Sequence, residues 1–224
     1  MKLIIDSANI EKIKDLYQYY PISGVTTNPS ILKRNGQDPY NTIKSIKEIV
    51  ENGQLHVQVI SKQSDDIVKE AKHICDVFGK ETYIKIPAVK QGYKAMKELS
   101  SLGYKITATA IYEPTQAYMA AMCGASYVAP YVNRVEKLYG DGVDMVKEII
   151  NIFKNNNLNC EILGASFKRK DQIQSMMNLG IDACTIDPDL FETLVQNKNV
   201  DEAVDAFRED FEELVGQGKT MLYK

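Results

Sequence analysis

The sequence predicts an α/β fold in which eight parallel strands close into a (β/α)8 TIM barrel, followed by an additional C-terminal helix. Three observations support this prediction. Short apolar runs alternate with amphipathic segments, a pattern typical of parallel βαβ units. The apolar runs number eight, which is the number that closes such a barrel. With 224 residues and a hydrophobic content of 44%, the chain is large enough for one domain of this kind.

The strands are predicted from apolar runs that end at turn-forming or polar residues. In the fourth run, Tyr83, Ile84 and Ile86 favour a pleated, buried surface, and Pro87 marks the exit. The eight predicted strands cover residues 2–5, 22–25, 55–60, 82–87, 106–111, 127–131, 161–165 and 183–186.

The helices are predicted from apolar residues that recur every three or four positions. One helix opens at Ser64, places Ile67, Val68 and Ala71 on one face, and ends before Gly79. Asn9 is a candidate cap for the first helix. Further helices are expected at 38–51, up to Leu102, at 116–123, up to Asn155, up to Gly180 and briefly after Asp187-Pro188, with a polar loop from Asn133 to Gly142.

One helix remains after the eighth strand. Asn199 is its candidate cap, and Glu202 stands where a capping box needs its second partner. Its apolar stripe either covers an end of its own barrel or docks on a neighbouring subunit. We therefore predict a barrel domain over residues 1–198 and a C-terminal helix and tail over 199–224. The stripe consists of Val200, Ala203, Val204, Phe207, Phe211, Leu214 and Val215.

A doubly wound open sheet is the alternative fold. No glycine-rich dinucleotide fingerprint follows the first strand, which weakens this alternative.

Composition excludes several classes of function. The net charge of −3 gives no electrostatic basis for binding nucleic acid or an anionic membrane. No apolar run is long enough to cross a bilayer, and Asp6 interrupts the first run too early for a signal peptide. Four widely spaced cysteines favour free thiols in a reducing cytoplasm. Since the chain has only two histidines, we expect no multi-histidine zinc or iron site. We also expect no metal and no cofactor.

Lys85 stands in the middle of the fourth predicted strand. Burying an ammonium is costly, and burial lowers the pKa of a lysine towards a neutral amine, which attacks carbonyl groups. The alternative is a lysine on an edge strand that faces water.

Polar residues follow the carboxyl ends of the predicted strands, where barrel enzymes place their chemistry. Each has a structural explanation, because caps, turns and strands favour the same residue types. Together they provide the parts for Schiff-base chemistry on a hydroxylated, phosphorylated carbonyl compound, with arginine and a helix N-terminus suited to the phosphate. The set comprises Asp6, Thr26, Thr27, Asn28, Gln58, Lys85, Thr109, Tyr131, Asn133, Arg134, Ser166, Lys168 and Asp187.

Four segments resemble the signatures of the small transaldolase family, which includes fructose 6-phosphate aldolases and short-chain transaldolases. They are GVTTNPS at 24–30, IKIP at 84–87, YVAPYVNR at 127–134 and ASFK at 165–168. The resemblance extends over essentially the whole chain, and it implies a metal-free class I aldolase that forms homo-oligomers, commonly pentamers or decamers.

The resemblance also implies roles for individual residues. Lys85 forms the Schiff base, and Asp6 handles protons and orients the substrate. Thr109 and Gln58 hold a catalytic water, with Tyr131 as acid–base partner. The predicted substrate-binding residues are Thr26, Asn28, Arg134, Ser166 and Lys168.

Two positions indicate the subtype within the family. Short transaldolases usually carry glutamate and phenylalanine where this chain has Gln58 and Tyr131. They also tend to carry asparagine at the position of Thr107, to which we assign no role. We therefore predict cleavage and formation of fructose 6-phosphate from dihydroxyacetone and glyceraldehyde 3-phosphate.

The alternatives are a transaldolase of the pentose phosphate pathway, which transfers the three-carbon unit to erythrose 4-phosphate, and a non-catalytic sugar-phosphate-binding barrel. A metal-dependent class II aldolase is disfavoured by the lack of clustered histidines.

Overall fold

The eight predicted strands form a closed parallel barrel in a computed structural model, which describes residues 1–222. Each strand pairs with the next in the chain, and β8 pairs with β1, so the open-sheet alternative is excluded. The strands are β1 (Lys2–Asp6), β2 (Gly24–Thr26), β3 (Gln54–Gln58), β4 (Tyr83–Pro87), β5 (Ile106–Ile111), β6 (Tyr127–Pro130), β7 (Glu161–Gly164) and β8 (Ala183–Ile186).

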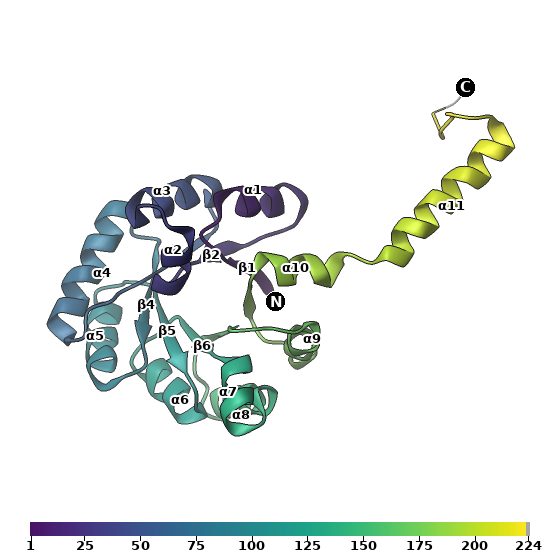
Figure 1. Ribbon diagram of the computed structural model, residues 1–224. Helices are drawn as coiled ribbons and strands as arrows, with labels where there is room; N and C mark the ends of the chain where they lie inside the picture. Colours follow the sequence, from purple (N-terminus) through teal and green to yellow (C-terminus); the bar gives the residue numbers. More distant parts are fainter. Residues whose placement is uncertain (223–224) are drawn as a thin grey trace. The chain divides into compact units, whose positions relative to one another are not determined.

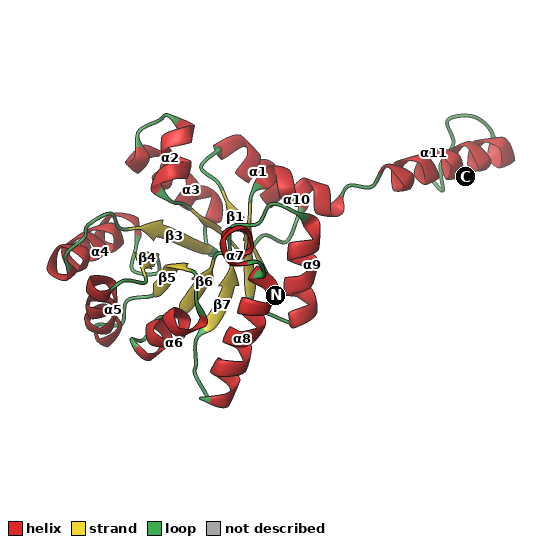
Figure 2. Ribbon diagram, turned by 60° about the horizontal axis from the view of Figure 1, so that its bottom comes forward, coloured by secondary structure: helices red, strands yellow, loops and turns green. Residues whose placement is uncertain are grey.

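The helices that alternate with the strands surround the ring on its outside (Figures 1 and 2). Among the described residues, none of the helices combines the length and apolar character of a membrane span. The helices are α1 (Ile10–Tyr19), α2 (Pro29–Asn35), α3 (Pro39–Val50), α4 (Ser64–Phe78), α5 (Lys90–Ser101), α6 (Pro114–Met122), α7 (Val132–Tyr139), α8 (Gly142–Asn155), α9 (Lys170–Leu179), α10 (Pro188–Val195) and α11 (Lys198–Val215).

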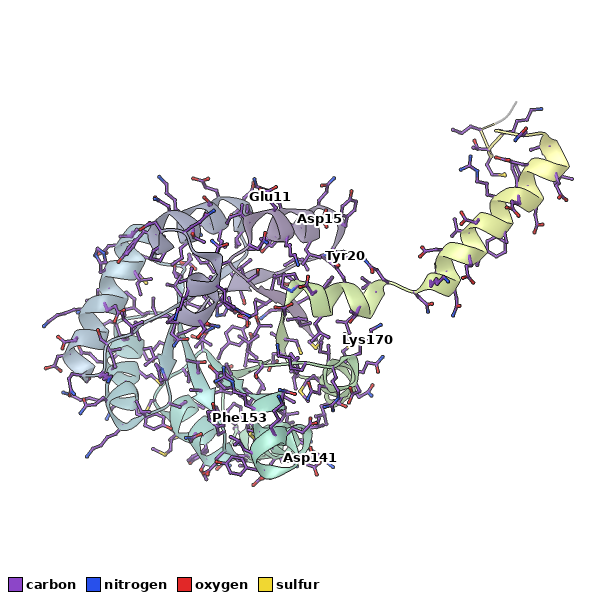
Figure 3. All side chains as sticks on the ribbon, viewed as in Figure 1. Glu11, Asp15, Tyr20, Asp141, Phe153 and Lys170 are labelled. Atoms are coloured by element: carbon purple, nitrogen blue, oxygen red, sulfur yellow. The ribbon has the colours of Figure 1, made fainter. Side chains whose placement is uncertain are left out.

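Side chains sort between core and surface as the amphipathic patterns predict. Phe153 of α8 is buried, whereas Glu11, Asp15, Asp141 and Lys170 are exposed at the periphery (Figure 3). The apolar faces of the helices pack on the outward-facing residues of the strands, and this layer forms the hydrophobic core.

Three local predictions are corrected by the structure. Residues 29–35 form α2, which Asn28 caps and Pro29 begins. Residues 132–139 form α7 instead of a polar loop, because Val132 and Val135 share one buried face. The cap of α11 is Asn197, not Asn199: the Asn197 side chain accepts the Asn199 N–H.

The chain divides into two compact units, Met1–Leu190 and Phe191–Lys224. All eight strands lie in the first unit. The second contains α11, none of whose residues is buried.

Polar side chains occupy the floor of the barrel, at the amino ends of the strands. Lys2 donates to the Glu161 carboxylate and to the Tyr127 hydroxyl at 2.8 Å. His56 is fully buried, and its Nδ1 lies 2.9 Å from the Thr107 hydroxyl. Burial, followed by the charges of Lys85 and Lys2, holds the pKa of His56 well below 6.5, so the imidazole is neutral.

The neutral His56 predicts a loss of stability in acid. Below pH 6.5 the unfolded chain binds a proton at His56 that the folded chain does not, so stability falls as the pH falls. Between pH 7 and pH 5, this histidine should remove about 2 kcal/mol of unfolding free energy, measured by urea denaturation at matched protein concentration. His56→Gln should lose that part of the pH dependence. His73→Gln, on the exposed face of α4, is the matched control. Equal pH dependence in wild type and His56→Gln would contradict the assignment.

Candidate active site

β4 places Lys85 inside the barrel. The strand is paired on both sides, which excludes an edge-strand lysine, and Lys85 is only 6% exposed. Its amine donates a 2.8 Å hydrogen bond to the backbone carbonyl of Thr27. Burial lowers the pKa of Lys85 below its ordinary value of 10.5, and the nearby charge of Asp6 opposes the shift. The result is an amine that loses its proton more readily than an exposed lysine and can act as a nucleophile.

β1 ends at Asp6, whose carboxylate is held by hydroxyl groups. Thr26 donates to Asp6 Oδ1 at 2.6 Å, and the hydroxyls of Thr26 and Thr185 lie 2.5 Å apart. Asp6 is not the helix cap, because the side chain of Asn9 caps α1. Thr26 therefore acts behind the site, where it orients the carboxylate.

A β-bulge positions Thr109. The register between β5 and β6 shifts between Ala108 and Ile111, and Ala110 takes a left-handed backbone conformation with φ 57°. Such a bulge redirects neighbouring side chains. Here the Thr109 hydroxyl lies 3.0 Å from the hydroxyl of Tyr131.

Asn28 closes β2 and begins α2. Its Oδ1 accepts the backbone N–H of Ile31 at 3.0 Å. This cap fixes the side chain and leaves its amide nitrogen as a hydrogen-bond donor for a ligand of the site.

Cationic and hydroxyl groups follow β6 and β7. Arg134 donates to the Tyr112 hydroxyl at 3.3 Å, and its guanidinium lies 4.7 Å from the centroid of the Tyr131 ring. Ser166, whose carbonyl accepts the Asn133 N–H at 3.0 Å, adopts a left-handed conformation with φ 62°, and the exposed Lys168 follows. Strain of this kind is concentrated at functional sites.

A side-chain network precedes the N-terminus of α9. The backbone N–H groups of Lys168 and Arg169 donate to Gln172 Oε1, at 2.9 and 3.3 Å. Glu136 also accepts from Gln172 and Arg169. Both residues precede the helix, which begins at Lys170, so a phosphate at this helix N-terminus stays a prediction.

These groups surround a cup of about 470 Å³ at the carboxyl ends of the strands. Eight of the ten predicted site residues line it, and Thr26 and Gln58 do not. The lining comprises the predicted Asp6, Asn28, Lys85, Thr109, Tyr131, Arg134, Ser166 and Lys168, together with Ser30, Ile31, Arg34, Ala129, Asn133, Lys137, Leu163, Ala165, Phe167, Thr185 and Asp187.

Gln58 and Thr107 flank Lys85 in the sheet but lie outside this cup. Gln58 pairs with Lys85 in register, yet it lines two neighbouring cavities, one of them a mainly apolar space of about 510 Å³. Thr107 faces His56 in the floor, one layer below Thr109. Its hydroxyl therefore belongs to the hydrogen-bond network of the floor.

Sequence reasoning missed several residues of the site. Thr185 was detectable, because strict alternation along β8 places it on the inner face. Arg34 and Lys137 lie on α2 and α7, the two helices that the prediction left out, so their helical spacing went unrecognised. Tyr112 gave no local signal.

Comparisons with known proteins agree over nearly the full length of the chain. A family model described as Transaldolase/Fructose-6-phosphate aldolase matches residues 3–221. A protein of Clostridioides difficile named probable transaldolase is 35% identical over 212 residues, covering 95% of this chain and 97% of the relative. A protein of Streptococcus pneumoniae named probable fructose-6-phosphate aldolase is 36% identical over 213 residues, covering 94% and 96%.

Solved structures with little sequence similarity share the fold alone. Dihydrodipicolinate synthase from Rhodopseudomonas palustris superposes with a TM-score of 0.61 at 13% identity, covering 94% of this chain and 79% of that chain. A flavocytochrome b2 variant with bound sulfite gives a TM-score of 0.58 at 14% identity, covering 95% and 64%.

The burial of Lys85 predicts an unusual labelling profile. When traces of acetic anhydride compete for all amines, acetylation of Lys85 should rise with pH around a midpoint below 10.5, because its pKa is lowered. Peptide mass spectrometry measures each lysine separately, and the exposed Lys90 provides an internal reference for reagent quality. A midpoint at or above 10.5 would refute the lowered pKa.

Proposed function

The chain belongs to the transaldolase/fructose-6-phosphate aldolase family, and from this premise we propose that it is a class I aldolase. It interconverts fructose 6-phosphate with dihydroxyacetone and glyceraldehyde 3-phosphate through a Schiff base. One observation carries the proposal: a buried lysine with a lowered pKa lies in a cup that it shares with a carboxylate, a hydroxyl pair and several cations.

In the proposed reaction the neutral amine of Lys85 attacks C2 of the ketose, and water leaves to give an iminium ion. The C3–C4 bond then breaks, its electron pair passes into the iminium to form an enamine, and the C4 hydroxyl loses a proton as the aldehyde departs. Protonation of C3 and hydrolysis of the imine release dihydroxyacetone and regenerate the amine. Asp6 is suited to stabilise the positive charge of the iminium and to orient the donor, because Thr26 fixes its carboxylate.

The cations of the cup define the phosphate end in this proposal. Arg134 and Lys168 follow β6 and β7, and Ser166 contributes a hydroxyl between them. Lys137, one helical turn after Arg134, adds a further positive charge at the rim. Asn28 contributes an amide for the hydroxyls of the donor.

Cleavage, as opposed to transfer, is supported by the hydroxyl pair of Thr109 and Tyr131. Two hydroxyls 3.0 Å apart can hold a water and pass a proton, which is what protonation of the enamine and hydrolysis of the imine require. Gln58 lies outside the cup, so in this proposal the water is held by Thr109 and Tyr131.

We further propose that the protein is a homo-oligomer of the cytoplasm. α11 exposes Val200, Val204, Phe207 and Leu214 along one face, and each is more than half exposed. Such a stripe favours docking on a second copy of the chain. The four cysteines are free thiols, which fits a reducing compartment.

Borohydride trapping tests the Schiff base. Reduction of the protein in the presence of dihydroxyacetone should attach a stable adduct to Lys85, located by peptide mapping, and activity should not change in a chelator. Lys85→Met should abolish both the adduct and turnover, whereas Lys90→Met should retain both. An adduct that survives in Lys85→Met, or a folded wild type without one, would refute the proposed chemistry.

Product analysis separates the two activities of the family. With fructose 6-phosphate alone, an aldolase should release free dihydroxyacetone, and erythrose 4-phosphate should not be required. Strict dependence on erythrose 4-phosphate would instead establish transfer.

Sedimentation tests the oligomer. We expect the wild type to sediment as a multiple of the 25.2 kDa chain, and Phe207→Glu to shift towards monomer because it places a charge in the apolar stripe. Asp205→Asn, on the same helix, should keep the wild-type mass. A monomeric wild type at micromolar concentration would contradict the proposal.

A further inference from the structure

A cluster of two tyrosines and one arginine links the cationic side of the cup to its hydroxyl pair. Tyr112 directly follows β5, whereas Tyr131 and Arg134 lie at the start of α7. The Arg134 guanidinium donates to the Tyr112 hydroxyl at 3.3 Å and lies 4.7 Å from the centroid of the Tyr131 ring. The two tyrosine rings meet edge to face, with centroids 5.5 Å apart. The guanidinium is thus held by the hydroxyl of one tyrosine and the ring face of the other.

Tyr131 connects this cluster to the reaction centre. The guanidinium stacks on its ring, and its hydroxyl lies 3.0 Å from that of Thr109. Both residues line the cup together with Lys85. Stacking of a cation on an aromatic face depends on the relative position of the two groups. A displacement of the guanidinium therefore acts on the ring whose hydroxyl pairs with that of Thr109.

We propose that Tyr112 is a positioning residue that couples phosphate recognition at Arg134 to the placement of the Tyr131 hydroxyl. The enzyme would then prefer phosphorylated aldehydes in turnover as well as in binding. This inference rests on the proposed function, because it requires a phosphate at Arg134 and proton transfer near Tyr131.

The physical argument concerns the freedom of the guanidinium. A phosphate can bind a guanidinium through two parallel hydrogen bonds and fix its plane. Tyr112 supplies an independent contact from the protein, so a bound phosphate would complete the immobilisation of the guanidinium over Tyr131. Without the Tyr112 hydroxyl, the guanidinium could follow the phosphate and leave the Tyr131 ring free to move.

Steady-state kinetics of Tyr112→Phe test the coupling. This variant keeps the ring against Tyr131 and removes only the hydroxyl that Arg134 uses. For the addition of dihydroxyacetone, the ratio of kcat/KM for glyceraldehyde 3-phosphate to kcat/KM for glyceraldehyde should fall about fivefold, partly through kcat. Tyr104→Phe, at the other end of β5, is the matched control and should keep the wild-type ratio. An unchanged ratio in Tyr112→Phe, or a change confined to KM, would overturn the proposal.

A second measurement starts from the wild type, where its main outcome does not depend on a variant. If phosphate at Arg134 orders Tyr131, inorganic phosphate should raise kcat for unphosphorylated glyceraldehyde, and the activation should be lost in Tyr112→Phe. Inhibition alone, or no effect on the wild type, would overturn the coupling.

The two levels of inference fail in different ways. If dihydroxyacetone cannot be trapped on Lys85, the proposed function fails. If it is trapped and the ratio in Tyr112→Phe equals that of the wild type, only the coupling fails.

Discussion

The burial of one amine inside a closed ring of strands is the constraint on which the rest of the site depends. Removing an ammonium from water costs several kcal/mol, so Lys85 is tolerated only because the protein provides compensating groups. The Thr27 carbonyl and the charge of Asp6 provide them for the charged form. The same two groups suit an iminium ion, which is also positive. An environment that merely favoured the neutral amine would not stabilise the positive charge of an iminium ion.

Closure of the barrel and the polar floor both determine the surroundings of the Lys85 amine. Thr185 reaches the hydroxyl that orients Asp6 only because β8 returns to pair with β1. Below the cup, the charge of Lys2 is matched by Glu161, while His56 remains neutral. A protonated His56 would place a second positive charge beneath Lys85. A fully hydrogen-bonded floor therefore keeps polar groups in the barrel interior without adding charge next to the amine.

Regular periodicity made the barrel and most of the cup predictable. Parallel strands bring their carboxyl ends together, so the sequence alone assigns Asp6, Lys85 and Thr109 to the same end of the barrel. Short helices such as α7 are difficult to recognise from periodicity, because the spacing of two buried valines within eight residues is also common in loops. Gln58 shows a second limit: register places it beside Lys85, yet it lines two neighbouring cavities and not the cup. The contact between Tyr112 and Arg134 spans 22 residues and had no local signal.

The geometry of the cup is set by departures from the ideal barrel. Ala110 and Ser166 both adopt left-handed backbone conformations, next to Thr109 and directly after β7 and Ala165 respectively. Each such residue costs of order 1–3 kcal/mol and persists only where the surrounding structure determines it. The paired strands and the packed helices hold both residues in these conformations. A regular ladder at β5 would lack the bulge that brings the Thr109 hydroxyl to Tyr131. The barrel therefore contributes to the chemistry mainly as a rigid frame, which is stable enough to hold these two backbone positions away from their preferred conformations.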